Sequence, residues 1–337
     1  MAQHITDMDM DMGKDMGVVV RSAGGPESLE WTRLDPASPG RGEVRIVQRA
    51  IGVNFIDTYF RSGLYPWPST PLIPGAEAAG VVAEMGEGVD GLKVGDRVAY
   101  TMPLGAYRTQ RIVAAERLVK LPDAIPFDVA ASVMLKGLTA QFLLTSCYSV
   151  KAGDTVLVHA AAGGVGLLLG QWLKALGATA IGTAGSPEKT AFAAAHGYTH
   201  VIDYRAEDFA ARVKEITGSK GCDVVYDSVG KDTWRGSLKC LKLRGMFVHF
   251  GQSSGMIADF KFSELAAGGS LYATRPMLFD YIKSREDLTS RAADLFSRLA
   301  SGELKAHVGQ RVALRDAAAA HRDLEGRRTM GATVLLP

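Results

Sequence analysis

The sequence predicts an α/β protein of two domains, one built mainly from short β-strands and one from a parallel sheet wound with helices. Its 337 residues exceed the roughly 250–300 at which a single hydrophobic core stops growing. The first third reads as short strands interrupted by Gly and Pro. From about Leu138, strand and helix patterns alternate, which is typical of βαβ units.

The N-terminal third is expected to start with a strand at residues 18–23, and alternating or β-rich segments follow at 42–53, 77–86 and 95–100. Residues 1–16 are rich in Met and Asp and carry neither an apolar signal segment nor an Arg-rich face. They therefore do not form an export or transit signal, and we expect a disordered tail.

The alternating region predicts parallel strands at residues 154–160, 178–184, 199–204, 222–229, 245–251 and 270–274, with helices between them. After Arg275 come two helical patterns, 286–303 and 315–328, and a last strand from 332. This tail is not a new βαβ run, so we expect it to return to the β-rich domain. The predicted domains are residues 17–136 together with 275–337, and residues 137–274.

Bulk properties exclude several functions. A formal net charge of +2 gives no reason to expect a nucleic-acid or membrane partner. The three cysteines, Cys147, Cys222 and Cys240, lie far apart and indicate a reducing compartment such as the cytoplasm. No uninterrupted apolar run reaches the ~18 residues of a membrane span.

A glycine-rich turn between the first parallel strand and its helix is the main functional signal. Gly163 would let the backbone approach a pyrophosphate, and Gly166 would let the helix pack close to its strand. The start of such a helix offers free N–H groups and a positive dipole end. Ala161 stands where the dinucleotide fingerprint has its first glycine. A tight strand-to-helix corner without a cofactor is the alternative.

The second parallel strand ends in "GTAGSPEK" and carries no acid to bind the ribose hydroxyls of NAD. Ser186 and Lys189 would instead accept the 2′-phosphate of NADPH, which a carboxylate would repel. Ser186 before Pro187 is also a helix N-cap, and Lys189 would then be merely solvated. We expect NADPH as the cofactor.

Five motifs, "HAAAGGVG", "GVNFIDTYFRSGLYP", "PGAEAAGVV", "VYDSVG" and "SLYATRP", resemble the NADPH-dependent quinone oxidoreductases. This is the zeta-crystallin-like, zinc-free branch of the medium-chain dehydrogenase/reductase superfamily. The resemblance runs from about Val18 to Pro337. It implies a GroES-like β-rich catalytic domain around an inserted Rossmann domain, a doubly wound parallel sheet that binds the cofactor.

The resemblance also implies that no metal is bound. Zinc-dependent relatives have a cysteine where this chain has Asn54 and a histidine where it has Ala76, and their cysteine-rich lobe is missing. A thiolate and an imidazole are ligands that a catalytic zinc needs. His159, on the first parallel strand, is expected to be a hydrogen-bonded core residue.

The resemblance also implies which residues form the site, position by position. A quinone would lie in a cleft lined by Asn54, Tyr59, Tyr65 and Arg275. Surface packing of the tyrosines and an interdomain salt bridge of Arg275 are the alternatives. The cofactor would contact Thr139, Gly163, Gly164, Val165, Ser186, Lys189, Tyr204, Ser228, Phe250, Gly251 and Arg327, although Arg328 beside Arg327 leaves that last assignment open. The family commonly dimerises edge to edge, so a homodimer is expected.

The sequence leaves three alternative functions to consider. Enoyl reductases that act on conjugated carbonyls share this architecture. Residues 251–255 also fit the hydrolase pattern G-x-S-x-G around Ser253, with Asp280 and His307 or His321 downstream, but the segment that follows lacks the helical periodicity of a nucleophile elbow. Some family members bind RNA or accumulate as crystallins, and here no basic and aromatic stripe supports RNA binding.

Overall fold

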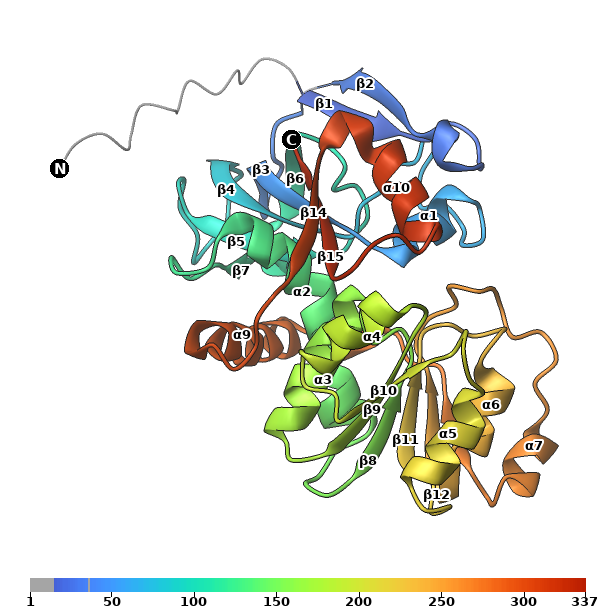
Figure 1. Ribbon diagram of the computed structural model, residues 1–337. Coiled ribbons are helices and arrows are strands. Elements are labelled where there is room, and N and C mark those ends of the chain that lie inside the picture. The colour runs from blue at the N-terminus through green and yellow to red at the C-terminus, as the bar shows by residue number, and fades with distance from the viewer. Residues whose placement is uncertain (1–14, 36) are drawn as a thin grey trace.

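The computed structural model describes residues 15–35 and 37–337 (Figure 1). The prediction for residues 1–14 lies outside the described part. Strand β1 (Asp15–Val19) pairs antiparallel with β2 (Glu30–Leu34), so the predicted tail was two residues too long. Asp15 anchors this start, because its Oδ1 accepts hydrogen bonds from the Thr109 hydroxyl at 3.1 Å and the Gln110 N–H at 3.2 Å.

A seven-stranded sheet forms the β-rich part of the molecule. Its strands, in spatial order, are β14 (Val308–Ala313), β15 (Ala332–Leu336), β3 (Glu43–Val53), β4 (Glu77–Met85), β5 (Arg97–Thr101) and β7 (Val119–Lys120), with β6 (Gln110–Ala114) paired to β3. The C-terminal strand β15 runs antiparallel to β3. Helices α1 (Phe55–Arg61) and α10 (Ala317–Glu325) lie side by side at one end of this sheet (Figure 1).

A six-stranded sheet, parallel throughout, forms the second part. Its order is β10 (His200–Asp203), β9 (Thr179–Ala184), β8 (Thr155–Val158), β11 (Cys222–Asp227), β12 (Leu241–His249) and β13 (Tyr272–Thr274). Its connecting helices are α3 (Gly164–Ala175), α4 (Pro187–Ala194), α5 (Phe209–Ile216), α6 (Trp234–Lys239) and α7 (Phe262–Ala267). The strand order reverses between β8 and β11, which is where doubly wound sheets bind ligands.

Helix α2 (Phe127–Phe142) connects the two sheets, because it packs on β3 and β4 and also on α3. It crosses the predicted domain boundary at residues 136/137. A π-turn continues it to Cys147. Among the described residues, Phe127–Cys147 is the one helix long and apolar enough for a membrane span, yet 78% of that window is buried inside the protein. We therefore assign it as a core helix. Helices α8 (Leu278–Tyr281) and α9 (Arg285–Ser301) also pack against it.

Candidate active site

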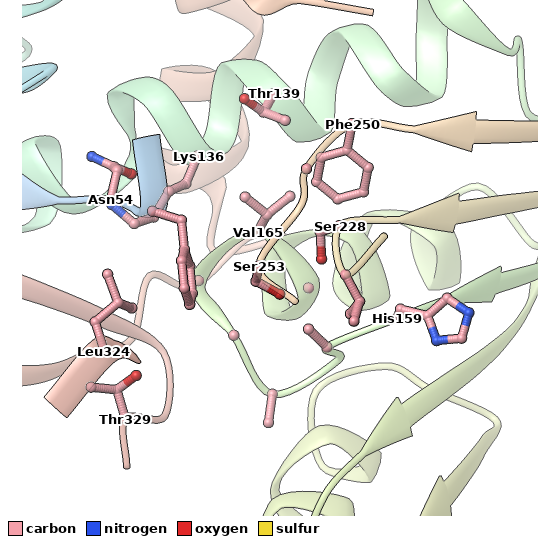
Figure 2. A pocket seen from close by; sticks show the side chains of 18 of the residues that line it. Asn54, Lys136, Thr139, His159, Val165, Ser228, Phe250, Ser253, Leu324 and Thr329 are labelled. Atoms are coloured by element: carbon pink, nitrogen blue, oxygen red, sulfur yellow. The ribbon is translucent and has the colours of Figure 1, made fainter. Parts of the chain in front are cut away.

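A cavity of about 570 Å³ lies between the two sheets, at the carboxyl ends of the parallel strands. The segments that follow β8, β9, β11 and β12 form part of the cavity wall. Helices α1 and α2 line the cavity on the side of the β-rich part. Figure 2 shows part of this lining. All fifteen side chains and glycines predicted from the sequence line this one cavity: Asn54, Tyr59, Tyr65, Thr139, Gly163, Gly164, Val165, Ser186, Lys189, Tyr204, Ser228, Phe250, Gly251, Arg275 and Arg327.

Helix α3 begins at the cavity wall. Its N-cap is Gly163, which has no side chain to accept the first helical N–H groups, and the N–H of Leu167 bonds to the Gly163 carbonyl at 2.9 Å. The N–H groups of the first helical turn have no partner within a helix, so they are free to bind an anion. A Cβ on Gly166 would lie 2.4 Å from the Ala160 carbonyl oxygen, so glycine is required where the helix approaches the strand.

The left-handed residue of this turn is Ala160, one residue before Ala161. Ala160 has a φ of +55°, in the left-handed region that costs a residue with a Cβ roughly 1–2 kcal/mol. Ala161, in place of the first fingerprint glycine, is fully buried and is held by its N–H, which donates to the Thr183 carbonyl at 2.9 Å. The turn keeps its shape without that glycine.

One end of the cavity is basic. Ser186 caps α4 by accepting from the Lys189 N–H at 3.3 Å, as predicted, and the Lys189 ammonium donates to the Arg327 carbonyl at 2.5 Å. Burial lowers the pKa of Lys189, and the positive charges of Arg205 and Arg327 lower it further. Three cations thus gather at a site that an anion would neutralise. Arg205 was not predicted from the sequence, although it follows Tyr204 directly.

The two adjacent arginines differ in their contacts. Arg327 lines the cavity, lies 3.5 Å from the Tyr204 hydroxyl and is 4.0 Å from the Asp232 carboxylate. Arg328 turns away and bonds to Asp323 at 2.8 Å. Of the two arginines, Arg327 lines the cavity and Arg328 does not.

At the other end, α1 carries two of the predicted acceptor-site residues. Asn54 precedes the helix as its N-cap, and Tyr59 accepts a 3.1 Å hydrogen bond from the backbone N–H of Gln252. Burial raises the pKa of Tyr59 to about 12. Arg275 donates to the Tyr65 hydroxyl at 3.2 Å and, among the described residues, forms no ion pair, so the interdomain salt bridge weighed above is not formed.

The remaining predicted residues lie between these ends. Thr139, on α2, donates its hydroxyl to the Leu135 carbonyl at 2.7 Å. A Cβ on Gly251 would lie 2.9 Å from the Ser228 carbonyl oxygen, so the loops after β11 and β12 touch here. Phe250 is half-buried beside them. Apolar atoms make up most of the cavity lining, and we call the space between the anion-binding turn and Tyr59 the apolar slot.

Sequence reasoning missed an ion pair in the cavity wall. The Lys136 ammonium bonds to Glu77 Oε1, and Asn54 Nδ2 donates to the same oxygen at 2.9 Å. The side chain of Lys136 is 7% exposed and that of Glu77 is fully buried. Lys136 stands in the "KGLTA" motif three residues before Thr139, and Glu77 follows the Ala76 that replaces a zinc ligand. Their places in these two motifs are the sequence signal from which the ion pair could have been predicted.

A chain of buried polar groups lies beneath α1. Arg61 donates to Nδ1 of His321 at 3.0 Å, so the proton of that imidazole is on Nε2, 2.9 Å from the Tyr107 hydroxyl. Tyr107 in turn donates to Asp57 Oδ2 at 3.2 Å, and that oxygen also accepts the Asn54 N–H. Burial raises the pKa of Asp57 to about 7 and, with the charge of Arg61, lowers that of His321 to about 3.

His159 is the core residue that the sequence predicted, although it also lines the cavity. It is 2% exposed, and its two ring nitrogens lie 2.9 Å from the Thr183 and Ser237 hydroxyls.

The hydrolase arrangement is not formed. No helix follows Ser253 directly, because α7 begins only at Phe262, and His321 is bound by Tyr107 and Arg61 instead. Within the described residues, no three His, Cys, Asp or Glu side chains are grouped so as to hold a metal ion.

Two family models match the chain. Residues 40–123 match the alcohol dehydrogenase GroES-like domain, and residues 164–286 match the zinc-binding dehydrogenase family. These ranges cover strands β3 to β7 of the β-rich part and all strands of the parallel sheet except β8. They agree with a GroES-like domain combined with a Rossmann-type domain.

Individual relatives span nearly the whole chain. A quinone oxidoreductase of Pseudomonas aeruginosa is 53% identical over 93% of this chain and 97% of its own. A 2-haloacrylate reductase of Burkholderia is 46% identical over 96% and 99%. The crystal structure of Escherichia coli quinone oxidoreductase complexed with NADPH superposes with a TM-score of 0.94, at 49% identity, over 96% of this chain and all of that one. The chain therefore belongs to the quinone oxidoreductase family of the medium-chain dehydrogenases/reductases.

Proposed function

We propose that the protein is an NADPH:quinone oxidoreductase that passes reducing equivalents from NADPH to a quinone in the cavity between its sheets. One observation supports this most directly: a single cavity contains an anion-binding helix start, a basic end and an apolar slot. Relatives at 50–53% identity are quinone oxidoreductases, which supports the same activity here.

The cavity fits NADPH by its donor set. The N–H groups at the start of α3 would hold the pyrophosphate, with Gly163, Gly164 and Val165 as the contacts. Ser186, Lys189, Arg205 and Arg327 would hold the 2′-phosphate, with Tyr204 over the adenosine. Thr139, Ser228, Phe250 and Gly251 would line the path to the nicotinamide. The bound cofactor supplies a hydride at its nicotinamide ring.

The acceptor end would hold a flat quinone against that ring. Asn54 and Tyr59 would donate hydrogen bonds to a quinone oxygen, while Tyr65 and Arg275, which contact each other, would close the rim. A quinone is a conjugated acceptor whose reduction restores an aromatic ring, so positioning contributes most of the catalysis. We propose that the reaction needs no zinc.

The proposal also includes an oligomeric state and a cellular location. Strand β13 is the edge of the parallel sheet, and Tyr272 on it is 58% exposed, which supports a homodimer formed at that edge. The free cysteines, of which Cys222 and Cys240 are buried, support a cytoplasmic location.

A second candidate function is the reduction of α,β-unsaturated carbonyl compounds. The similarity to a 2-haloacrylate reductase over 99% of its length favours it. Such a substrate is also a conjugated acceptor and would fit the same slot.

Loss of NADPH absorbance with a panel of quinones, and with an enone and 2-chloroacrylate beside them, tests both candidates. We expect faster turnover of quinones, a preference for NADPH over NADH, and no effect of a chelator. Turnover of the unsaturated carbonyls alone would favour the second candidate, and inhibition by the chelator would contradict the zinc-independent reaction.

A further inference from the structure

Reduction of a quinone by a hydride leaves an anion that needs one proton, and Arg275, Asn54, Tyr59 and Thr139 do not supply it readily. Arg275 cannot release a proton. The Tyr59 hydroxyl accepts the Gln252 N–H, and burial raises the pKa of Tyr59 to about 12, so its own O–H is a weak acid. The Thr139 hydroxyl donates to the Leu135 carbonyl, and Asn54 is not an acid.

Lys136 has a transferable proton and lies in the same wall. It projects from α2, lines the cavity and is bonded to Glu77. Among the described residues, Glu77 is its one hydrogen-bond partner, so two of the three ammonium N–H groups have no protein acceptor. The residue is 6% exposed, so these two N–H groups are held inside the protein.

Contacts on both sides fix where this ammonium lies. A Cβ on Gly164 would come within 2.6 Å of Lys136 Cδ and 3.1 Å of Cε, so the lysine stem lies against the start of α3. Glu77 Oε1 joins the ammonium to the Asn54 amide, and Glu77 Oε2 accepts the Leu135 N–H at 2.6 Å. Figure 2 shows Lys136 beside Asn54 on the cavity wall. The ammonium is therefore held between the anion-binding turn and the acceptor end.

We infer that Lys136 is the general acid that protonates the reduced acceptor, with Glu77 as the residue that positions it. This inference rests on the proposed function. The hydride carries two electrons to the quinone as the C–H bond of the reduced nicotinamide breaks. An N–H bond of Lys136 then breaks as an O–H bond forms on the hydroquinone anion, and the electron pair stays on Nζ. Lys136 regains a proton from solvent, so NADPH, quinone and H⁺ yield NADP⁺ and hydroquinone.

Two substitutions of Lys136 and one double variant separate acid catalysis from positioning. Lys136→Met removes both charge and proton, and we expect kcat to fall by about 100-fold, within the usual range for general acids. Lys136→Arg keeps the charge for Glu77 but cannot give up a proton. It should therefore bind NADPH within about threefold of the unmodified protein by fluorescence quenching, while kcat stays low. If the unpaired Glu77 prevents Lys136→Met from folding, the double variant Lys136→Met/Glu77→Gln replaces it, because glutamine removes the buried charge.

Chemical rescue gives the decisive readout. In Lys136→Ala, added alkylammonium ions should restore turnover, and more acidic ammonium ions should restore it faster. Full kcat in Lys136→Arg, rescue independent of ammonium acidity, or an NADPH affinity that falls in step with kcat would each overturn the inference. Failure of the proposed function would instead appear in the unmodified protein, as absence of NADPH oxidation with every quinone.

Discussion

The methyl group of Ala161 fills space that Gly182 leaves free on the neighbouring strand β9. A Cβ placed on Gly182 would lie 2.7 Å from Ala161 Cβ and 2.9 Å from the Tyr198 ring. Ala161 lies in the turn after β8, Gly182 lies in the adjacent parallel strand β9, and both residues are buried. The replaced fingerprint glycine is thus compensated on the next strand rather than within the turn.

Gly182→Ala should therefore overpack the wall behind the glycine-rich turn. We expect a loss of roughly 1–3 kcal/mol in the free energy of unfolding, because inserted methyl groups force shifts in a close-packed core. The double variant Ala161→Gly/Gly182→Ala should recover part of this loss, with Tyr198 accounting for the rest. Denaturant unfolding of these two variants and of the single variant Ala161→Gly measures it, and additive losses would show that the two methyl groups do not compete for one space.

Lys189→Ala should weaken NADPH binding selectively. A charge-assisted hydrogen bond contributes about 1.5–3 kcal/mol, which corresponds to a roughly 10–100-fold rise in the KM for NADPH. The KM for NADH should barely change, because NADH has no 2′-phosphate. Arg328→Ala is the matched control, since Arg328 bonds to Asp323 outside the cavity. Equal effects of Lys189→Ala on both cofactors would contradict the phosphate assignment.

Tyr59→Phe should loosen the contact between α1 and the loop after β12. It removes the acceptor of the Gln252 N–H, which we expect to cost about 1 kcal/mol in stability and to raise the KM for quinone. Because the pKa of Tyr59 is about 12, its removal should leave the pH profile below pH 10 unchanged. A lost ionisation in that range would contradict this role.

Asp57 should make stability fall as pH rises. Its folded pKa of about 7 lies above the ordinary value of 3.8, so the folded state binds the extra proton between these pH values. The stabilisation is complete below pH 4 and is lost as pH rises towards 7, by at most about 1.4 kcal/mol per pH unit.

His321, whose pKa is lowered to about 3, acts in the opposite direction between pH 3 and 6.5. The Asp57 contribution is therefore measured as a difference. The stability of Asp57→Asn relative to the unmodified protein should increase from pH 5 to pH 8 in denaturant unfolding. A difference that is independent of pH would contradict the raised pKa.

The parts of the site that residue spacing alone predicts are encoded locally, whereas distant residues such as Asn54 and Arg275 follow from the family resemblance. The glycine turn and the Ser186–Lys189 cap lie within a few residues of each other, so spacing identifies them. Lys136 and Glu77 are separated by 59 positions, and no periodic pattern pairs a lysine with a carboxylate at that distance. The chain from Arg61 to Asp57 requires α10 to return beside α1. The left-handed Ala160 has no sequence signature, because alanine rarely adopts that conformation.

The central claim is that one cavity holds NADPH at the start of α3 and a quinone beside Asn54. A crystal structure of the protein with NADPH and an unreactive quinone analogue tests it most directly. We expect the pyrophosphate on the N–H groups of Gly164 and Val165, the 2′-phosphate between Lys189 and Arg327, and the analogue between the nicotinamide and Tyr59. A cofactor bound elsewhere, or a metal ion coordinated next to Asn54, would contradict the account.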